Sequence, residues 1–386
     1  MFGLIETGFG NLTLGNLGML LIGALLIWGG IAKKKEPLLL VPIGFGAIIV
    51  NLPLSGLMMH TPEGLPALGG LSEVASGEIG LLNLVYHYGL YTKVIPLLIF
   101  LGVGTMMDFQ PTIARPISLV FGAAAQLGVF IIFLAAYFSG FFTLEEAASV
   151  AMIGGSDGPP TVFITVALAP HLLGPITMIA YAYMALVPLI QPPVIRSLTT
   201  QKERAMEMNQ EVREVSKGEL ILFPILVFLV STLLVPGSAP LIGMLMFGNL
   251  LRVSGVTERL AIAGSTMNDM LLVLLGLCVG ALMPAQVFFD PRTLLMILLA
   301  IFAFVIGTAG GVITAKILNL FIKDKINPII GAAGVSAVPM AARVAHSEGL
   351  RANPNNYLIM HALGPNMAGA ISTSVVAGVF LGMIGY

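Results

Sequence analysis

Long apolar segments follow one another along almost the whole chain. They cover residues 14–32, 37–52, 94–107, 117–139, 145–169, 173–195, 220–236, 238–251, 260–282, 292–319, 327–341 and 356–384. Because a helix needs about 20 apolar residues to cross a bilayer, these segments allow roughly nine to twelve crossings. They lack the alternating pattern of a transmembrane β-barrel. The sequence therefore predicts an all-α polytopic membrane protein.

The composition supports this fold class and excludes several others. Of the 386 residues, 57% are hydrophobic and 10% are charged, whereas an average soluble domain carries about 25% charged residues. So few charges do not cover the surface of a soluble enzyme of this length. The net charge of −1 argues against a nucleic-acid-binding protein, and the single cysteine argues against a disulfide scaffold.

Two clusters of charged residues set the predicted topology. One is Lys33-Lys34-Lys35-Glu36, directly after the first apolar segment, and the other lies between Arg196 and Glu219. Basic residues in short loops mark the cytoplasmic side of a membrane protein. We therefore predict a solvated cytoplasmic linker at 196–219 between two membrane repeats, at 94–195 and 220–386. Residues 1–93 should form amino-terminal helices, an external loop and an interfacial helix.

The two halves share a helix-breaking motif. Asp157-Gly158-Pro159 precedes a small, hydroxyl-bearing apolar stretch in the first half, and Leu363-Gly364-Pro365 precedes a similar stretch in the second. Breaks at corresponding positions indicate a central binding site in transporters built from inverted repeats. We predict broken or re-entrant segments at 154–160, 327–339 and 363–366. Residues 145–169 should return to the side from which they enter.

The first break contains a carboxylate. The segment Gly154–Pro160 interrupts a helix, because its glycines are flexible and its two prolines lack an N–H donor. Asp157 lies inside it, where an unpaired carboxylate in a membrane costs at least about 2.5 kcal/mol. With the hydroxyls of Ser156 and Thr161 and the freed carbonyls, Asp157 offers hard oxygen ligands that suit Na⁺ or H⁺. The alternative is that Asp157 caps the following half-helix.

The second half offers neutral ligands and one cation. Asn366 and Thr373 are seven residues apart and share a helical face, as do Ser336 and Arg343. Asn366, Thr373 and Ser336 are candidate Na⁺ ligands, unless they only pack between helices. Arg343 is a candidate to bind an anionic carboxylate or to pair with Asp157, unless it extends toward the cytoplasmic membrane edge.

Three other side chains have two interpretations each. Tyr183 is either a membrane-interface residue or a proton donor in a cavity. Asp269 lies at the start of a long apolar segment, which favours a helix amino-terminal carboxylate over a ligand. For His361, packing or capping is favoured over a proton role.

Four motifs, in this order, resemble the β subunit of the sodium-pumping, biotin-dependent decarboxylases, which serve oxaloacetate, methylmalonyl-CoA, glutaconyl-CoA and malonate. The motifs are GGSDGPP (Gly154–Pro160), YMALVPLIQPP (Tyr183–Pro193), GAAGVSAVPMAARVAHSEG (Gly331–Gly349) and LGPNMAG (Leu363–Gly369). The resemblance covers about residues 94–386. Ser156 replaces the alanine expected in this family, and Pro160 replaces a threonine. One hydroxyl therefore moves, which puts the ligand role of Thr161 in question.

The resemblance implies a fold and a function. The fold is that of an elevator-like transporter with two inverted repeats. The subunit decarboxylates carboxybiotin, exports Na⁺ and consumes a proton. Its cofactor is carried by a partner and is not covalently bound to this chain. The implied partners are a biotin carrier protein, a carboxyltransferase subunit and a small membrane γ or δ subunit, with several copies of the chain in one complex in a prokaryotic cytoplasmic membrane.

The resemblance also assigns roles to residues. The catalytic set is Asp157, Tyr183 and Arg343, and the cofactor-binding set is Arg343, Asn327 and Gly331. The Na⁺ ligands that it implies are Asp157, Ser336, Asn366 and Thr373, and the hydroxyls of Ser156 and Thr161 join this set from their position in the break rather than from the resemblance.

Two other functions are alternatives to a decarboxylase subunit. The first is a secondary Na⁺/carboxylate transporter or Na⁺/H⁺ antiporter, which has no chemistry and needs no partner. The second is a membrane anchor for an enzyme complex, which has no reason to keep paired helix breaks with buried oxygen ligands.

Overall fold

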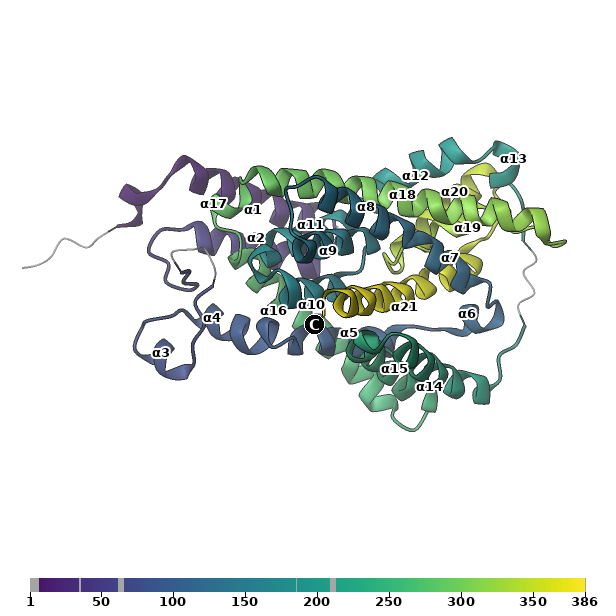
Figure 1. Ribbon diagram of the computed structural model, residues 1–386, viewed down its shortest axis with the longest axis horizontal. Coiled ribbons are helices and arrows are strands. Elements are labelled where there is room, and N and C mark those ends of the chain that lie inside the picture. The colour runs from purple at the N-terminus through teal and green to yellow at the C-terminus, as the bar shows by residue number, and fades with distance from the viewer. Residues whose placement is uncertain (1–6, 35, 62–65, 185, 209–212, 386) are drawn as a thin grey trace, which may run out of the picture.

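The computed structural model describes residues 7–34, 36–61, 66–184, 186–208 and 213–385. Apart from one isolated bridge between His60 and Pro66, all regular structure in these residues is helical (Figure 1). The elements are η1 (Gly8–Asn11), α1 (Leu14–Ala32), α2 (Pro37–Asn51), α3 (Leu71–Ala75), α4 (Leu81–Val85), η2 (Tyr86–Tyr91), α5 (Val94–Met106), α6 (Gln110–Ala114), α7 (Ser118–Ala125), α8 (Leu127–Phe138), α9 (Leu144–Ala151), η3 (Met152–Gly155), α10 (Gly158–Leu168), η4 (Pro170–Leu172), α11 (Leu173–Met184), α12 (Val187–Leu198), α13 (Gln201–Arg204), α14 (Lys217–Leu234), η5 (Pro236–Ser238), α15 (Ala239–Ser254), α16 (Glu258–Ala281), α17 (Ala285–Phe288), α18 (Pro291–Phe321), α19 (Ile329–Ala332), α20 (Met340–Ala352) and α21 (Ile359–Ile384).

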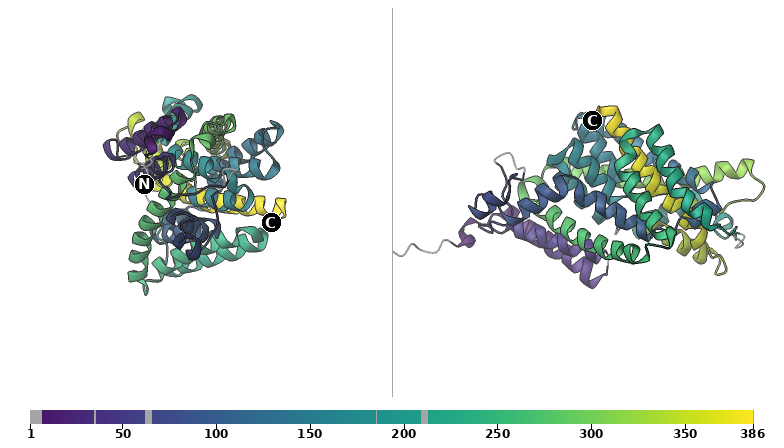
Figure 2. Two further views of the ribbon diagram at one scale, coloured as in Figure 1. Left: turned by 90° about the vertical axis from the view of Figure 1, so that its left-hand side faces the viewer. Right: turned by 90° about the horizontal axis from the view of Figure 1, so that it is seen from below.

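The helices form two groups. In the first, which we call the helix row, each helix packs on the next in the order α1, α2, α16, α5, α15 and α14. In the second, the hairpin bundle, α18 packs on α7, α8, α12 and α19, while α21 packs on α7, α10 and α20. Figure 1 shows α21, in yellow, between α14–α15 along one edge and α8–α18 along the other, and Figure 2 shows the same arrangement from two further sides.

Six helices of the described chain are long and apolar enough to cross a membrane. The number rises to eight if each of two bent pairs, Leu81–Tyr91 with Val94–Met106 and Pro170–Ala182 with Val187–Leu198, forms one span. This is fewer than the roughly nine to twelve crossings allowed by the apolar segments. Two of those segments, 145–169 and 327–341, contain short helices joined by non-helical turns, and α2 has only 15 residues.

The first re-entrant hairpin consists of α9, η3 and α10. Its two ends meet, because Nε2 of His171, just after α10, lies 2.8 Å from Oε1 of Glu146 at the start of α9. Arg292 in the first turn of α18 binds the other oxygen of Glu146. Residues 145–169 therefore enter and leave the bundle at the same end, as predicted. We call this the loop end, because Asn51, which leads into residues 52–93, bonds there to the backbone of Met283 and Ala285.

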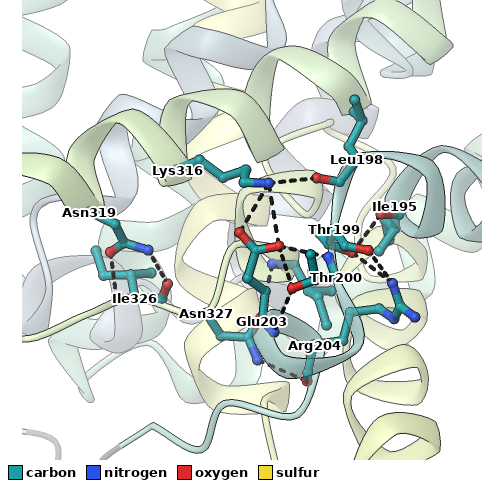
Figure 3. A network of polar contacts seen from close by, with 11 residues as sticks. Ile195, Leu198, Thr199, Thr200, Glu203, Arg204, Lys316, Asn319, Ile326 and Asn327 are labelled. Carbon is teal, nitrogen blue, oxygen red and sulfur yellow. Dashed lines mark hydrogen bonds and ion pairs between the residues drawn. The ribbon is translucent and has the colours of Figure 1, made fainter.

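The second hairpin consists of α19, a non-helical segment at Ala333–Pro339, and α20. Its ends are held by the linker, at the opposite end of α18, and Figure 3 shows the contact of Asn327 with Arg204. Asn327, just before α19, donates to the carbonyls of Arg204 and Met206. Asn353 and Asn356, just after α20, donate to the carbonyls of Ala205 and Arg204. We call this the linker end. The two hairpins thus enter from opposite ends of the molecule, as inverted repeats require.

Helix α21 differs from the prediction. We expected a break at 363–366, but α21 is continuous from Ile359 to Ile384 and includes Pro365. A transmembrane helix tolerates a proline when neighbouring helices satisfy and enclose the affected backbone. Pro365 withholds a donor from the carbonyl of His361, and the Gly-Pro pair is enclosed by neighbouring elements, since Thr112 donates to the Gly364 carbonyl and Gly364 packs against Ser118 and Pro111.

Candidate functional site

The tips of the two hairpins meet at Asp157. The Ser336 hydroxyl, in the second tip, donates to Oδ2 of Asp157, in the first, over 2.9 Å. Asp157 is only 7% exposed and Ser336 only 3% exposed. A carboxylate at such a depth requires compensating polar contacts. The meeting point therefore joins a buried carboxyl group to a hydroxyl from the other half of the chain.

The local sequence shapes the first tip. Ser156 has a φ of +53°, a left-handed conformation that is strained for a residue other than glycine. Asp157 is extended, and α10 begins at Gly158 with Pro159 in its first turn. The Thr161 hydroxyl satisfies two carbonyls of the break, those of Met152 and Asp157. The tip is therefore well defined although it is not helical.

The Asp157 side chain does not cap α10. It occupies the N-cap position but makes no capping hydrogen bond, so the alternative interpretation as an ordinary cap is not supported. The amino-terminal end of α10, which carries a partial positive charge, still lies next to it and favours an anion.

Asn366 of α21 holds the second tip. Its Nδ2 donates to the carbonyls of Ala333 (3.0 Å) and Val335 (2.8 Å), directly before Ser336. Its Oδ1 is buried and has no hydrogen-bond partner in the described part of the chain. The same holds for Oγ of Ser156. Two neutral oxygens, one from each half of the chain, are therefore left uncompensated near the meeting hairpin tips.

Thr373 lies behind the first tip. Its hydroxyl donates to the Gly369 carbonyl and accepts from Nε2 of Gln126, and its side chain contacts Gly155. Gln126 also donates to Ser372. The structure thus places Thr373 against the break, with its oxygen already engaged by Gln126, a residue that carried no signal in the sequence.

A cavity of about 400 Å³ separates the helix row from the hairpin bundle at this point. Asp157 and Ser336 lie in its wall together with two further carboxylates, Glu36 and Asp269. From the row it is lined by Glu36, Leu39, Ile99, Val103, Met106, Met107, Asn268, Asp269 and Leu272, and from the bundle by Asp157, Pro159, Tyr181, Met184, Ser336, Val338, Pro339, Leu363, Met367 and Ala370.

Tyr181 of α11 is a site residue that sequence reasoning missed. It lines the cavity, is 2% exposed, and its hydroxyl has no partner among the described residues. Its ring packs so closely on Gly158 that a Cβ there would lie 2.2 Å from it. The side chain of Tyr183, the predicted tyrosine, lies outside the described residues. The only sequence signal for Tyr181 is its position two residues before Tyr183.

Arg343 is exposed in the first turn of α20 and forms no ion pair in the described chain, so the possible pairing with Asp157 is absent. Its guanidinium instead interacts electrostatically with the carboxyl group of Glu36, in the turn between α1 and α2. Burial raises the pKa of the Glu36 carboxyl, and the positive charge of Arg343 opposes that rise. Arg343 therefore lies near one wall of the cavity.

The other two predicted cofactor residues lie apart from the cavity lining. Asn327 binds the linker, as described above. Gly331 packs on Gly311 of α18 so tightly that a Cβ on it would lie 2.1 Å from the Gly311 carbonyl oxygen. In this structure both residues fix the position of the second hairpin.

Asp269 differs from its predicted position. We expected it at the start of a helix, but α16 begins eleven residues earlier, at Glu258. The carboxylate is therefore near the middle of a membrane-length helix. It is exposed toward the cavity rather than placed at a helix terminus.

Comparison with known proteins agrees with the motifs. Residues 15–384 match the family model for the Na⁺-transporting oxaloacetate decarboxylase β subunit. The chain is 48% identical to methylmalonyl-CoA decarboxylase subunit beta of Propionigenium modestum, with 98% of each chain covered. It is 46% identical to oxaloacetate decarboxylase beta chain 2 of Salmonella typhi, with 97% of this chain and 96% of the relative covered. It is also 46% identical to methylmalonyl-CoA decarboxylase subunit beta of Veillonella parvula, with 98% and 96% covered.

Proposed function

Because this chain belongs to the family of β subunits of Na⁺-transporting oxaloacetate decarboxylases, we propose that it is the membrane subunit of a Na⁺-translocating decarboxylase. In this role it decarboxylates carboxybiotin and couples the reaction to Na⁺ export and proton consumption. The observation that carries the assignment of the site is the hydrogen bond between Ser336 and Asp157 where the two hairpin tips meet.

The relatives support a carboxyl donor that reaches this subunit on biotin. Two of them, at 48% and 46% identity, are named for decarboxylases of different substrates, methylmalonyl-CoA and oxaloacetate. A membrane subunit that recognised either substrate directly would need different binding residues for each. A common carrier, carboxybiotin, lets one membrane site serve both. Its chemistry is loss of CO₂, which leaves a biotin nitrogen that must take up a proton.

The site is suited to Na⁺. A hard monovalent cation requires oxygen ligands and a compensating negative charge. Asp157 provides the charge, and the unpartnered oxygens of Ser156 and Asn366 are the neutral ligands we favour most. Ser336, Thr161 and Thr373 complete the proposed set. Their hydroxyl protons are already donated elsewhere, which leaves oxygen lone pairs available.

Arg343 is the proposed anchor for the cofactor carboxylate. Its guanidinium is exposed and matches a carboxylate geometrically. We propose that Asn327 and Gly331 support cofactor binding indirectly, because their contacts place the hairpin that carries Arg343. Tyr183, or a water that it orients, is the proposed proton donor to biotin.

Coupling follows from the charge on Asp157. The carboxylate holds Na⁺ only while it is ionised, since protonation removes the negative ligand. Arrival of a proton at Asp157 therefore releases Na⁺. The proton then passes by way of Tyr183 to the biotin nitrogen that has lost CO₂, so one consumed proton serves both steps and Asp157 is left ionised for the next Na⁺.

The surroundings follow from the same proposal. We place the subunit in the prokaryotic cytoplasmic membrane, with the linker end in the cytoplasm, where a biotin carrier protein and a carboxyltransferase subunit meet it. A small membrane γ or δ subunit and further copies of this chain would pack in the membrane. Helix α14 is suited to lipid or subunit contacts, because Pro224 is the one residue of this helix that is buried.

The test is decarboxylation of carboxybiotin by the purified complex carrying Asp157→Asn. Removing the charged partner from a buried pair costs about 2–5 kcal/mol, so Na⁺-stimulated activity should fall by about 30-fold or more. Asp324→Asn, which removes an exposed carboxylate far from this cavity's lining, is the control. Full activity of Asp157→Asn would remove Asp157 from the mechanism. Transport by the wild type that is insensitive to avidin would instead indicate a carrier without biotin chemistry.

A further inference from the structure

Asp269 is a carboxylate on the opposite wall of the Asp157 cavity. It projects from the middle of α16 in the helix row, whereas Asp157 belongs to the hairpin bundle. Within the described chain its side chain forms no ion pair and no hydrogen bond. An ionisable side chain in the middle of a membrane span lowers the stability of the inserted helix, which makes Asp269 a candidate functional group.

The adjacent Asn268 provides an independent observation. It lines the same cavity and is 4% exposed. Its Oδ1 is buried and has no hydrogen-bond partner in the described residues. Its Cβ contacts the position of Gly102 on α5, so the side chain is held by the packing between two row helices. A buried carbonyl oxygen without a hydrogen-bond donor is destabilising, unless a cation or a water molecule binds to it.

The charge of the cavity selects the sign of the ligand. Its wall contains three carboxylates, those of Glu36, Asp157 and Asp269, and none of its lining residues is lysine or arginine. Arg343 lies next to Glu36 and reduces the negative potential there. The region between Asp157 and Asp269 therefore attracts a cation rather than an anion.

We propose that Asp269 and the Asn268 carboxamide oxygen form a second alkali-cation site on the helix row, opposite the one at Asp157. The inference rests on the proposed function in one respect, since the cation is the transported Na⁺. The ion occupies the two sites in turn, one on the helix row and one on the hairpin bundle. A site on each wall allows Na⁺ to pass from one helix group to the other without crossing the cavity unliganded.

The experiment compares Asp269→Asn, Asp269→Glu and Glu78→Gln in the intact complex reconstituted into liposomes. Glu78 is an exposed carboxylate outside the cavity and provides the matched control. Two quantities are measured, the Na⁺ concentration for half-maximal decarboxylation and the uptake of radioactive Na⁺ per CO₂ released. Asp269→Asn should raise the Na⁺ concentration for half-maximal decarboxylation by about tenfold, which is the expected effect of losing one charged ligand. It should also lower the uptake of Na⁺ per CO₂ released. Asp269→Glu keeps the charge but moves it by one methylene, so it should raise the Na⁺ concentration for half-maximal decarboxylation by a smaller factor than Asp269→Asn does. Glu78→Gln should match the wild type.

The outcomes separate this inference from the proposed function. If Asp269→Asn has the wild-type Na⁺ dependence and uptake ratio while Asp157→Asn is inactive, the second site is refuted and the proposed function stands. If Asp157→Asn is fully active, the proposed function fails whatever Asp269 does. Thermal unfolding of Asp269→Asn in detergent must match the wild type. If it does not, Asp269→Glu alone decides, because a Glu variant with raised Na⁺ requirement and correct folding supports a ligand and one without any change contradicts it.

Discussion

Ser156 offers a test of the cation site at the scale of one atom. Its backbone is left-handed, and its buried hydroxyl oxygen has no hydrogen-bond partner in the part of the chain that the structure describes. Ser156→Ala removes that oxygen and leaves the backbone preference almost unchanged. If Ser156 is a ligand, the Na⁺ concentration for half-maximal decarboxylation should rise by about two- to tenfold, the value of one neutral polar contact. The melting temperature should not fall.

The control for Ser156→Ala is Ser374→Ala, which removes another fully buried hydroxyl. Among the described residues, the Ser374 hydroxyl bonds to the Ala370 carbonyl of its own helix and to no other group. Its loss should leave the Na⁺ dependence unchanged. Equal Na⁺ dependence in the wild type and both variants would exclude Ser156 from the ligand set.

The two tyrosines of α11 separate proton donation from packing. Tyr183→Phe should lower the decarboxylation rate by about a hundredfold or more, because a positioned general acid contributes at least that much. Tyr181→Phe keeps the ring that packs on Gly158 and removes a hydroxyl that no described residue contacts through a hydrogen bond, so it should retain most of the activity. The test is to measure the decarboxylation rates of both variants. If Tyr181→Phe is the slower of the two, the proton donor is Tyr181 and not Tyr183.

At the residue scale, the sequence identified which side chains belong to the candidate site better than it identified the residues that contact them. The break around Asp157 follows from its glycines and prolines. The bond from Ser336 to Asp157 joins residues 179 positions apart, and neither spacing nor periodicity contains that information. Gln126 and Tyr181 were missed for the same reason, because each acts through a contact with another element.

At the scale of the elements, the hairpins show where local signals suffice and where packing overrides them. Gly-Pro in the first half starts α10 after a true break, but Gly-Pro in the second half lies inside the continuous helix α21. The partner of the first break is instead the segment Ala333–Pro339, within the predicted 327–339. Propensity alone does not distinguish the two, since Thr112 and close neighbours support the backbone around Pro365.

The sequence predicts a solvated linker, but the structure shows it docked on the second hairpin. Lys316 of α18 forms an ion pair with Glu203 (3.0 Å), and Asn327, Asn353 and Asn356 bind linker carbonyls. An exposed ion pair contributes about 0.2–1 kcal/mol and each amide bond about 0.5–1.5 kcal/mol. The asparagines should therefore dominate, and Asn327→Ala should speed proteolysis of the linker more than Glu203→Gln does. Limited proteolysis in detergent measures this, and a larger effect of Glu203→Gln would contradict it.

Linker docking should also resist mild changes of pH. Burial disfavours the ionised Glu203 carboxyl, but hydrogen bonds from Thr200 and Lys316 outweigh burial and lower its pKa. A lowered pKa contributes stability above the range in which a free glutamate titrates, and that stability is lost only as the pH falls through the lower folded value. Cleavage of the linker should thus be constant between about pH 6 and pH 8. A steep change in that range would mean that another group controls docking.

At the scale of the whole molecule, the important relation is between the helix row and the hairpin bundle. The two hairpins enter the bundle from opposite ends, and their tips meet beside the cavity that separates it from the row. A cation held at the tips is therefore bound by one helix group and faces the other. This arrangement places ion binding where a displacement between the groups would change access to it.

The most direct test of the central claim is Na⁺ binding to the purified subunit, measured by equilibrium dialysis with radioactive Na⁺ in the absence of biotin carrier. The wild type should bind Na⁺ saturably. Ser336→Ala should weaken binding, because it removes the hydroxyl that contacts Asp157. Asp157→Asn should bind at least about 30-fold more weakly than the wild type. Wild-type affinity in a correctly folded Asp157→Asn subunit would contradict the account, since the cation would then be held without the carboxylate at the hairpin tips.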